Sequence, residues 1–376
     1  MAKDLLQDRF GRFYEIPRVL AQSGHEVHGV CLKYWPANTD RPIPRPCEFV
    51  DWSSFSLGRN WPLGFFEHYQ RLDQISARIK PDIVVGASDC AHVVMAAWLA
   101  AKFGVPYAVD LYDNFESYRT TQIPGMKQLL RRAVRKAAAV SVVSETLLAK
   151  VREEYQPTGV LRTITNAIAP ELFHAADKTT ARRCLGLPEA ETLIGTAGSL
   201  TRARGIETLY RAFDRLSKTK PNLSLVLAGP TDEWSAWQLG SRIIHLGELS
   251  HERVGNLFNA LDVGIICNRD DEFGRYCFPQ KLFEMLACGL PLVAADVGAM
   301  RGLLPGYERY LFAPGSAASL ADAIVAQLET RYLPAAAIPT WQDCGLMFEN
   351  LLEAAVAPSA PSLSRIDAVH LGADVL

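Results

Sequence analysis

Residues 273–293 read FGRYCFPQKLFEMLACGLPLV and contain, in order, a helix, the glycine that ends it and the strand that follows. Pro279 favours a helix start, because its ring holds φ near the helical value and a first-turn residue needs no N–H. Gly289 is typical of the residue just after a helix, and the apolar run from Pro291 predicts a buried strand. Helix, short turn and buried strand predict a parallel α/β sheet.

The same alternation extends in both directions from this stretch. In the first half, short β-branched runs predict strands at 27–32, 82–86, 106–111, 140–143 and 161–165, and the helical period predicts helices at 13–22, 65–79, 91–103, 126–138 and 145–155. In the second half the strands are 192–196, 223–228, 243–246, 263–266 and 291–294, and the helices are 205–217, 252–260, 279–288, 320–330 and 341–355. Residues 166–188 have mixed polar and turn character and separate the halves.

The predicted fold is therefore α/β, with two Rossmann-like domains that face a central cleft. A chain of 376 residues has the length of two domains at roughly 100–200 residues each. Ligands of parallel α/β sheets bind outside the carboxyl ends of the strands, so the cleft is the expected site. We predict domains at 1–168 and 169–340, a helix at 341–356 that returns to the first domain, and a mobile tail at 357–376. A first strand would have to lie within residues 1–7.

Composition excludes several classes of protein. The formal net charge is -2, so no basic field is present to hold nucleic acid. The eight cysteines form no C-x-x-C pair, which indicates reduced thiols in a cytoplasmic protein. The longest apolar stretch, 90–101, is about half a membrane span, and no signal-peptide pattern is present. We therefore expect neither secretion nor a membrane span.

The helix start at Pro279 predicts an anion site. Free N–H groups of Gln280, Lys281 and Leu282 would point at a ligand from the positive end of the helix, and Lys281 adds a formal charge. Glu284 lies on the same helix face as Gln280, where a carboxylate can accept hydrogen bonds from two ribose hydroxyls. Phosphate and ribose together indicate a nucleotide. The alternative is that Pro279 only starts a helix and Glu284 is a solvated charge.

Other polar residues follow strands and so face the same cleft. In TAGSLTRARGIE, residues 196–207, Arg202 and Arg204 lie in a glycine-containing loop where a guanidinium can clamp a diphosphate. The alternative is two solvated arginines. Four further polar residues follow strands, namely Ser88, Asp89, Asp110 and Asp113. Each can bind sugar hydroxyls, and the alternative is that it caps a helix.

Two further patterns are weaker. No histidine belongs to a metal motif, and the acidic run Asp270–Glu272 is typical of a solvated loop, so we expect no metal. The helix Lys127–Lys136, KQLLRRAVRK, carries five basic residues. It suits contact with an anionic membrane surface or acceptor, and equally an ordinary surface helix.

Taken together, these motifs resemble the retaining family 4 glycosyltransferases of GT-B architecture. The resemblance runs from GHEVHGV at Gly24 through TNAIAPELF at Thr165 to the helix at 320–330, and is strongest in GSLTRARGIETL and PQKLFEMLACGLPLVAADVG. It implies a nucleoside diphosphate sugar held mainly by the second domain. It also implies a glycan or lipid-linked acceptor held mainly by the first, transfer with retained configuration, and no metal cofactor. Peripheral contact with the inner face of a membrane fits such acceptors.

The resemblance also assigns residues by position. Gly198 and Ser199 begin the diphosphate loop, where Arg204 matches the second basic residue of the family's pair. Ser199 stands where the family often has arginine, and Arg202 is a candidate substitute. Within the family's Glu-x(7)-Glu signature, Glu284 matches the second glutamate, which binds ribose, and Tyr276 replaces the first.

The Tyr276 departure resembles the P-x-K-l-x-E subgroup, with Pro279 and Lys281 in place. Glu272, in the preceding loop, is then the candidate to replace the first glutamate in contact with the donor sugar. Asp113 takes the place near the reacting sugar where the family has a histidine. Charge that grows on the leaving phosphate would be stabilised by Arg204, Lys281 and the helix N-terminus.

We therefore predict a glycosyltransferase that uses a nucleoside diphosphate sugar. One alternative is a non-catalytic subunit that binds a sugar nucleotide or glycan on the same fold, because the first glutamate is missing. A sugar-nucleotide 2-epimerase is a weaker alternative, because no clear pair of carboxylates is poised for proton abstraction.

Overall fold

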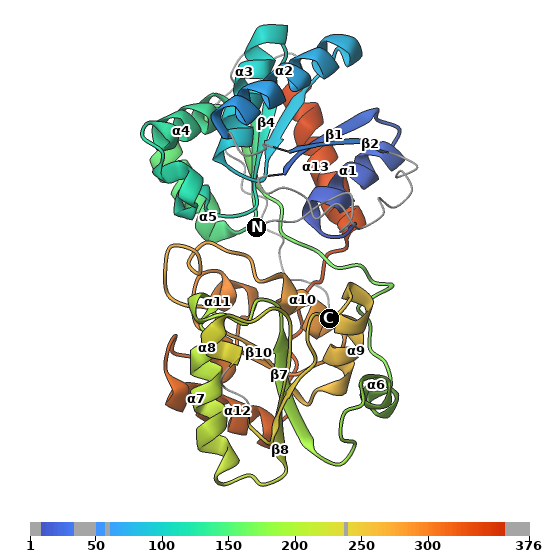
Figure 1. The fold of residues 1–376 in the computed structure, drawn as a ribbon, viewed down its shortest axis with the longest axis vertical. Coiled ribbons are helices and arrows are strands. Elements are labelled where there is room, and N and C mark those ends of the chain that lie inside the picture. The colour runs from blue at the N-terminus through green and yellow to red at the C-terminus, as the bar shows by residue number, and fades with distance from the viewer. Residues whose placement is uncertain (1–8, 34–49, 57–60, 237–239, 358–376) are drawn as a thin grey trace, which may run out of the picture.

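The computed structural model describes residues 9–33, 50–56, 61–236 and 240–357, and it has two lobes stacked along its longest axis (Figure 1). The N-terminal lobe contains the strands up to β6, the helices up to α5 and the last helix, α13. The C-terminal lobe contains the remaining elements. The strand expected within residues 1–7 and the tail at 358–376 lie outside the described residues.

The N-terminal lobe is built on parallel strands. A four-stranded sheet has the order β3-β4-β5-β6, and β1 pairs with β2 beside it. Its strands are β1 Val27–Lys33, β2 Val50–Ser56, β3 Val84–Ala87, β4 Tyr107–Leu111, β5 Ala139–Val142 and β6 Val160–Thr163. Its helices are α1 Arg12–Gln22, α2 Trp61–Ile79, α3 Cys90–Phe103, α4 Met126–Lys136, α5 Glu145–Lys150, which runs on as a π turn over Val151–Tyr155, and α13 Trp341–Val356.

The C-terminal lobe has one six-stranded parallel sheet in the order β12-β11-β10-β7-β8-β9. Its strands are β7 Thr192–Ala197, β8 Leu223–Ala228, β9 Ile243–His245, β10 Val263–Ile266, β11 Leu292–Ala295 and β12 Leu311–Phe312. Its helices are α6 Lys178–Leu185, α7 Ile206–Ser217, α8 Glu233–Ala236, α9 His251–Ala260, α10 Gln280–Ala287, α11 Met300–Leu303 and α12 Ala317–Glu329. The predicted fold class, two parallel α/β units, is confirmed.

Five strands and α-helices of the described structure were absent from the sequence prediction, namely β2, α6, α8, α11 and β12, and two of them show the physical reason. The strand β2, VDWSSFS, is too polar to be recognised from its sequence. It is formed through parallel pairing with β1, in which Gly29 lies opposite Trp52. Glycine is needed there, because a Cβ on Gly29 would overlap the ring of Trp52. The helix α6 lies in the segment 166–188, for which we predicted turns. Its apolar pattern is interrupted by Arg182, which is buried and donates to the Ala260 carbonyl and to Asp262. A buried arginine that bonds to the end of α9 and to the turn before β10 thus replaces the usual apolar residue.

The last helix closes the N-terminal lobe. After the C-terminal lobe the chain crosses back, and α13 lies beside α1 (Figure 1). Thr340 and Asp343 form a capping box at its start. Gly345 allows the close approach of the two helices, because a Cβ there would lie 2.4 Å from Val19.

A buried ion pair joins several of these elements. The guanidinium of Arg12, at the start of α1, donates to both carboxylate oxygens of Asp110 at 2.8 and 2.7 Å. It also donates to the carbonyls of Ile164 and Thr165, just after β6. Ser141 on β5 donates to Asp110 at 2.6 Å. The pair therefore holds α1, β4, β5 and the chain leaving β6 together.

Arg12→Ala should lower the free energy of unfolding by about 3–5 kcal/mol, because it leaves the Asp110 carboxylate buried without its cation. Urea unfolding of the wild type and the variant measures the loss. The double variant Arg12→Met with Asp110→Leu should recover much of it, since no buried charge remains. A single variant as stable as the wild type would contradict this account.

Candidate functional site

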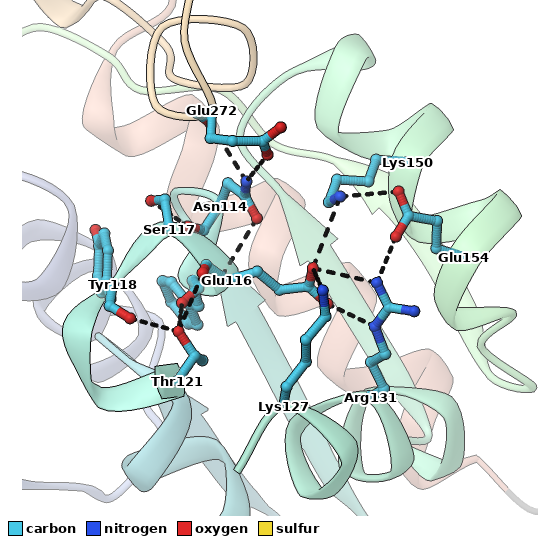
Figure 2. Close-up of polar contacts among 11 residues, drawn as sticks. Asn114, Glu116, Ser117, Tyr118, Thr121, Lys127, Arg131, Lys150, Glu154 and Glu272 are labelled. Carbon is cyan, nitrogen blue, oxygen red and sulfur yellow. Dashed lines mark hydrogen bonds and ion pairs between the residues drawn. The ribbon is translucent and has the colours of Figure 1, made fainter. Parts of the chain in front are cut away.

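The carboxyl ends of the two sheets meet between the lobes. Asn114 follows β4 and Glu272 follows β10, and the Asn114 side-chain amide donates to the Glu272 carboxylate at 3.2 Å and to its backbone carbonyl at 3.3 Å. The contact is drawn in Figure 2. This is the edge at which parallel α/β sheets bind ligands, as the sequence predicted.

The loop after β7 packs closely against the side chain of Lys281 on α10. Gly198 has a φ of 117°, which disfavours any residue with a side chain, and a Cβ there would lie 3.2 Å from the Lys281 ammonium. Lys281 donates to the Ala197 carbonyl at 2.7 Å. Burial lowers the pKa of Lys281 from its usual value. The loop and the first turn of α10 therefore place a desolvated ammonium beside bare backbone, as phosphate binding requires.

The helix start differs in detail from the prediction. Pro279 is the N-cap of α10 and Gln280 its first residue, one position later than expected. Of the three N–H groups predicted to be free, that of Gln280 donates to the Phe278 carbonyl and that of Leu282 to the Pro279 carbonyl. The prediction is wrong for these two, because the first turn is tightened by bonds over shorter spans than in an α-helix. No such contact contradicts the prediction for the Lys281 N–H, among the described residues, and it stays a prediction.

Glu284 is buried with only 7% of its surface exposed. Gln280, one turn earlier, donates to its Oε1 atom at 2.9 Å, so the two residues share a helix face as predicted. His251 at the start of α9 lies 3.5 Å from the same oxygen through Nε2. A buried carboxylate in this setting is not the solvated charge of the alternative interpretation. The sequence did not point to His251, because nothing in its local pattern separates it from a surface residue at a helix start.

The two arginines of the loop after β7 diverge. The Arg204 guanidinium lies 3.6 Å from the centre of the Phe273 ring and faces Asp113 and Lys281 closely enough to influence the pKa of each. Arg202 is directed elsewhere, over the Trp234 ring at 5.3 Å and toward Glu207 at 3.6 Å. Arg204 therefore lies with Lys281 and Asp113, whereas Arg202 packs against α8. Ser199 is exposed beside Gly198.

Asp113 is the carboxylate that the N-terminal lobe turns toward Arg204. It is 5% exposed and accepts hydrogen bonds from the Tyr118 hydroxyl at 2.9 Å and from the Asn114 N–H at 2.8 Å. Burial raises the pKa of Asp113 to about 6, although Tyr118, Asn114 and Arg204 each oppose the rise. Asp113 therefore exchanges a proton near neutral pH, as groups at reacting centres commonly do.

The other carboxylates predicted at strand ends have structural roles. Asp110 is occupied by Arg12, and Asp89 caps α3 by accepting from the N–H groups of Ala91 and His92. Ser88 beside it has a φ of 81°, a strained value for serine. In the acidic run, Asp270 pairs with Arg275, and Asp271 accepts from the backbone of its own loop. Within the described ranges no group of metal-ligating side chains is present.

Tyr276 replaces the family's first glutamate and is turned toward the other lobe. Its carbonyl accepts a hydrogen bond from Ser144 at 3.0 Å, and its ring lies 5.1 Å from the Lys150 ammonium. With the Asn114 contact, the loop after β10 thus binds the N-terminal lobe at three points. Ser144 and Asn114 were not singled out from the sequence, although Ser144 is a recognisable helix cap.

The basic helix α4 is partly neutralised. Figure 2 shows Lys127, Arg131 and Lys150 gathered around the Glu116 carboxylate. Burial alone would raise the pKa of Glu116, but hydrogen bonds led by Arg131 and Lys127 lower it to about 2. Two of the five basic residues that we noted in the helix are therefore paired with a carboxylate of their own lobe. Contact with a membrane stays a prediction, and none of the described helices is long and apolar enough to cross one.

Two family models match the chain where these residues lie. The model described as "Glycosyl transferase 4-like domain" matches residues 12–167, and "Glycosyl transferases group 1" matches residues 191–330. The chain belongs to the group 1 glycosyltransferases. A relative of this glycosyltransferase, the N-acetyl-alpha-D-glucosaminyl L-malate synthase of Bacillus anthracis, is 22% identical over 85% of this chain and 84% of its own.

Solved structures confirm the GT-B fold. The sucrose-phosphate synthase of Thermosynechococcus elongatus superposes on this glycosyltransferase with a TM-score of 0.73 at 18% identity, over 90% of this chain and 91% of that one. Anabaena Alr3699/HepE in complex with UDP-glucose gives 0.62 at 18% identity, over 87% and 95%. The resemblance deduced from the sequence is therefore confirmed for family and fold.

The raised pKa of Asp113 predicts a pH-dependent stability. Between about pH 4 and 6 the folded protein binds this proton more tightly than the unfolded chain, so ionisation at higher pH destabilises the fold. Relative to Asp113→Asn, the wild type should lose about 2 kcal/mol of unfolding free energy from pH 4 to pH 7. Urea unfolding at several pH values measures this difference.

Glu116→Gln is the control, because its pKa is shifted the other way. The wild type should gain stability over this variant as pH rises from about 2 through the ordinary range of a glutamate. A difference between wild type and Asp113→Asn that does not change with pH would show that Asp113 titrates normally.

Proposed function

We propose that this glycosyltransferase moves a sugar from a nucleoside diphosphate sugar to a hydroxyl group of a glycan or lipid-linked acceptor, with retention of configuration. The observation that carries the proposal is the convergence of Arg204, Lys281 and the buried Glu284 around the start of α10. Two cations beside bare backbone suit a diphosphate, and a buried carboxylate suits a ribose. The complexes of Alr3699/HepE with UDP and with UDP-glucose support this class of donor.

Each residue has a role in the proposed reaction. Gly198 and Ser199 bring backbone close to the diphosphate, with Gln280 and Leu282 framing the first turn of α10. Charge that develops on the leaving diphosphate is stabilised by Arg204 and Lys281. No metal cofactor is then required. Arg202, which the resemblance offered as a second clamp, lies over Trp234 and is left out of the site.

The N-terminal lobe would supply the acceptor side. Asp113 lies opposite Arg204 and can hold a hydroxyl or take up a proton, because its pKa is raised to about 6. The departing phosphate is itself a base, so Asp113 need only orient the acceptor. Glu272, held by Asn114, replaces the missing first glutamate as a contact for the donor sugar. The loop contacts between the lobes exclude water from the reacting sugar, which limits hydrolysis.

Glu284→Ala should weaken the nucleotide response of the protein without abolishing it, because the proposed diphosphate groups remain. A nucleotide that binds the folded state raises the melting temperature by mass action. We expect UDP or GDP, and its sugar conjugates, to raise the melting temperature of the wild type and to raise that of the variant by clearly less at the same ligand concentration. Thermal-shift titration with both nucleotides measures this. A response retained in full by Glu284→Ala would contradict the assignment of the ribose site.

Arg204→Ala should lower the rate of transfer more than the affinity for the donor. The guanidinium is proposed to act on charge that appears mainly as the diphosphate leaves, so its loss raises the barrier by about 3 kcal/mol, or roughly a hundredfold in kcat. Release of the nucleoside diphosphate with a panel of acceptors measures kcat, and a titration measures Kd. Arg202→Ala is the matched control and should change kcat little. Equal effects of the two variants would refute the distinction.

A further inference from the structure

His251 occupies an unusual place at the first position of α9. Its ring contacts two phenyl rings, that of Phe10 with 4.5 Å and that of Phe173 with 5.0 Å between ring centres. Phe173 is 1% exposed and also packs on Phe258, so it gives the ring a rigid support. The orientation of the imidazole is therefore set by its neighbours.

The polar contacts of the ring indicate which nitrogen carries the proton. Nε2 faces Glu284 Oε1 at 3.5 Å, at the long limit of a hydrogen bond. Nδ1 is buried and has no hydrogen-bond partner among the described residues. A buried N–H without an acceptor is costly, and Nε2 is the ring nitrogen that faces an acceptor, so we assign to Nε2 the N–H that points at Glu284. His251 thus donates toward the Glu284 carboxylate.

Both side-chain contacts of Glu284 fall on one oxygen. Gln280 and His251 each approach Oε1, and in the described part of the chain no hydrogen bond is made to Oε2. With Oε1 held by two donors, the rotation of the carboxylate is restricted. Oε2 then keeps its lone pairs for a ligand, and two adjacent hydroxyls of a ribose are the ligand of the proposed function.

Phe10 connects this arrangement to the other lobe. It lies two residues before Arg12, the buried anchor of α1 in the N-terminal lobe, whereas α9 and α10 belong to the C-terminal lobe (Figure 1). The tilted ring contact between Phe10 and His251 is therefore a contact between the lobes. It forms only when the lobes are in this relative position.

We propose that His251 and Phe10 are positioning residues for ribose recognition: Phe10 of the N-terminal lobe holds the His251 ring, and His251 with Gln280 holds the Glu284 carboxylate for the two ribose hydroxyls. The inference rests on the proposed function, since it takes Glu284 as the ribose ligand. It adds that the ribose site is complete only when the two lobes are in contact.

The test compares two ligands that differ only in the ribose hydroxyls. Isothermal titration of the full chain gives the Kd for UDP and the Kd for 2′,3′-dideoxy-UDP. The ratio of interest is the Kd for dideoxy-UDP divided by the Kd for UDP. GDP and its dideoxy analogue are run in parallel. A residue with a merely structural role changes both Kd values alike and leaves the ratio unchanged. We expect the ratio to fall about three- to tenfold in His251→Leu and in Phe10→Ala. Glu284→Ala should bring it close to one.

Three controls keep the outcomes distinct. His251→Gln retains an N–H donor and should preserve most of the ratio, even if His251→Leu is poorly folded. His25→Leu removes an exposed histidine that pairs with Glu349 far from the site, and should leave the ratio unchanged. Circular dichroism melting shows which variants are folded.

The results separate the two proposals. A ratio that collapses in Glu284→Ala but stays at the wild-type value in both His251→Leu and Phe10→Ala would overturn this inference and leave the proposed function intact. A ratio that survives in Glu284→Ala would overturn the ribose assignment itself. A ratio that falls in His251→Leu and recovers in His251→Gln supports the inference.

Discussion

The ion pair between Arg12 and Asp110 is the constraint on which the N-terminal half of the site depends. Both charges are almost fully buried, and such a pair is tolerated only because both partners have further hydrogen bonds, to Ser141 and to the chain after β6. Arg12 fixes the start of α1 and so the loop that carries Phe10. Asp110 fixes the end of β4 and so the loop that carries Asp113 and Asn114. The ion pair between Arg12 and Asp110 therefore positions both loops of the N-terminal lobe that face the C-terminal lobe.

The C-terminal lobe has a corresponding contact in the bond from Lys281 to the Ala197 carbonyl. It ties the first turn of α10 to the end of β7, and so links the loop that carries Arg204 to the helix that carries Glu284. The desolvation that lowers the pKa of Lys281 is the cost of placing a cation there. An anionic ligand would offset that cost, which is a physical reason to propose a diphosphate at this position.

Tyr276, which stands at the position of the first glutamate of the family signature, takes part in the contact between the lobes. A glutamate there would face the Glu116 and Glu154 carboxylates around Lys150, whereas an aromatic ring accepts the ammonium of Lys150 without adding negative charge. The loop after β10 then serves to hold the lobes against each other. Asn114 and Glu272 complete the same junction from the neighbouring turn, as Figure 2 shows.

Local sequence alone determined the α/β alternation, the helix at α10, and the shared face of Gln280 and Glu284, because helical period, proline and glycine act within a few residues. Only the tertiary structure decided which strand-end residues are occupied by structural contacts and which are left for a ligand. Asp110, Asp89 and Arg202 looked equivalent to Asp113 and Arg204 in the sequence, yet buried pairing, helix capping and stacking on Trp234 occupy the first three. The roles of His251, Asn114 and Phe10 likewise depend on contacts between residues more than 100 positions apart, which no local pattern encodes.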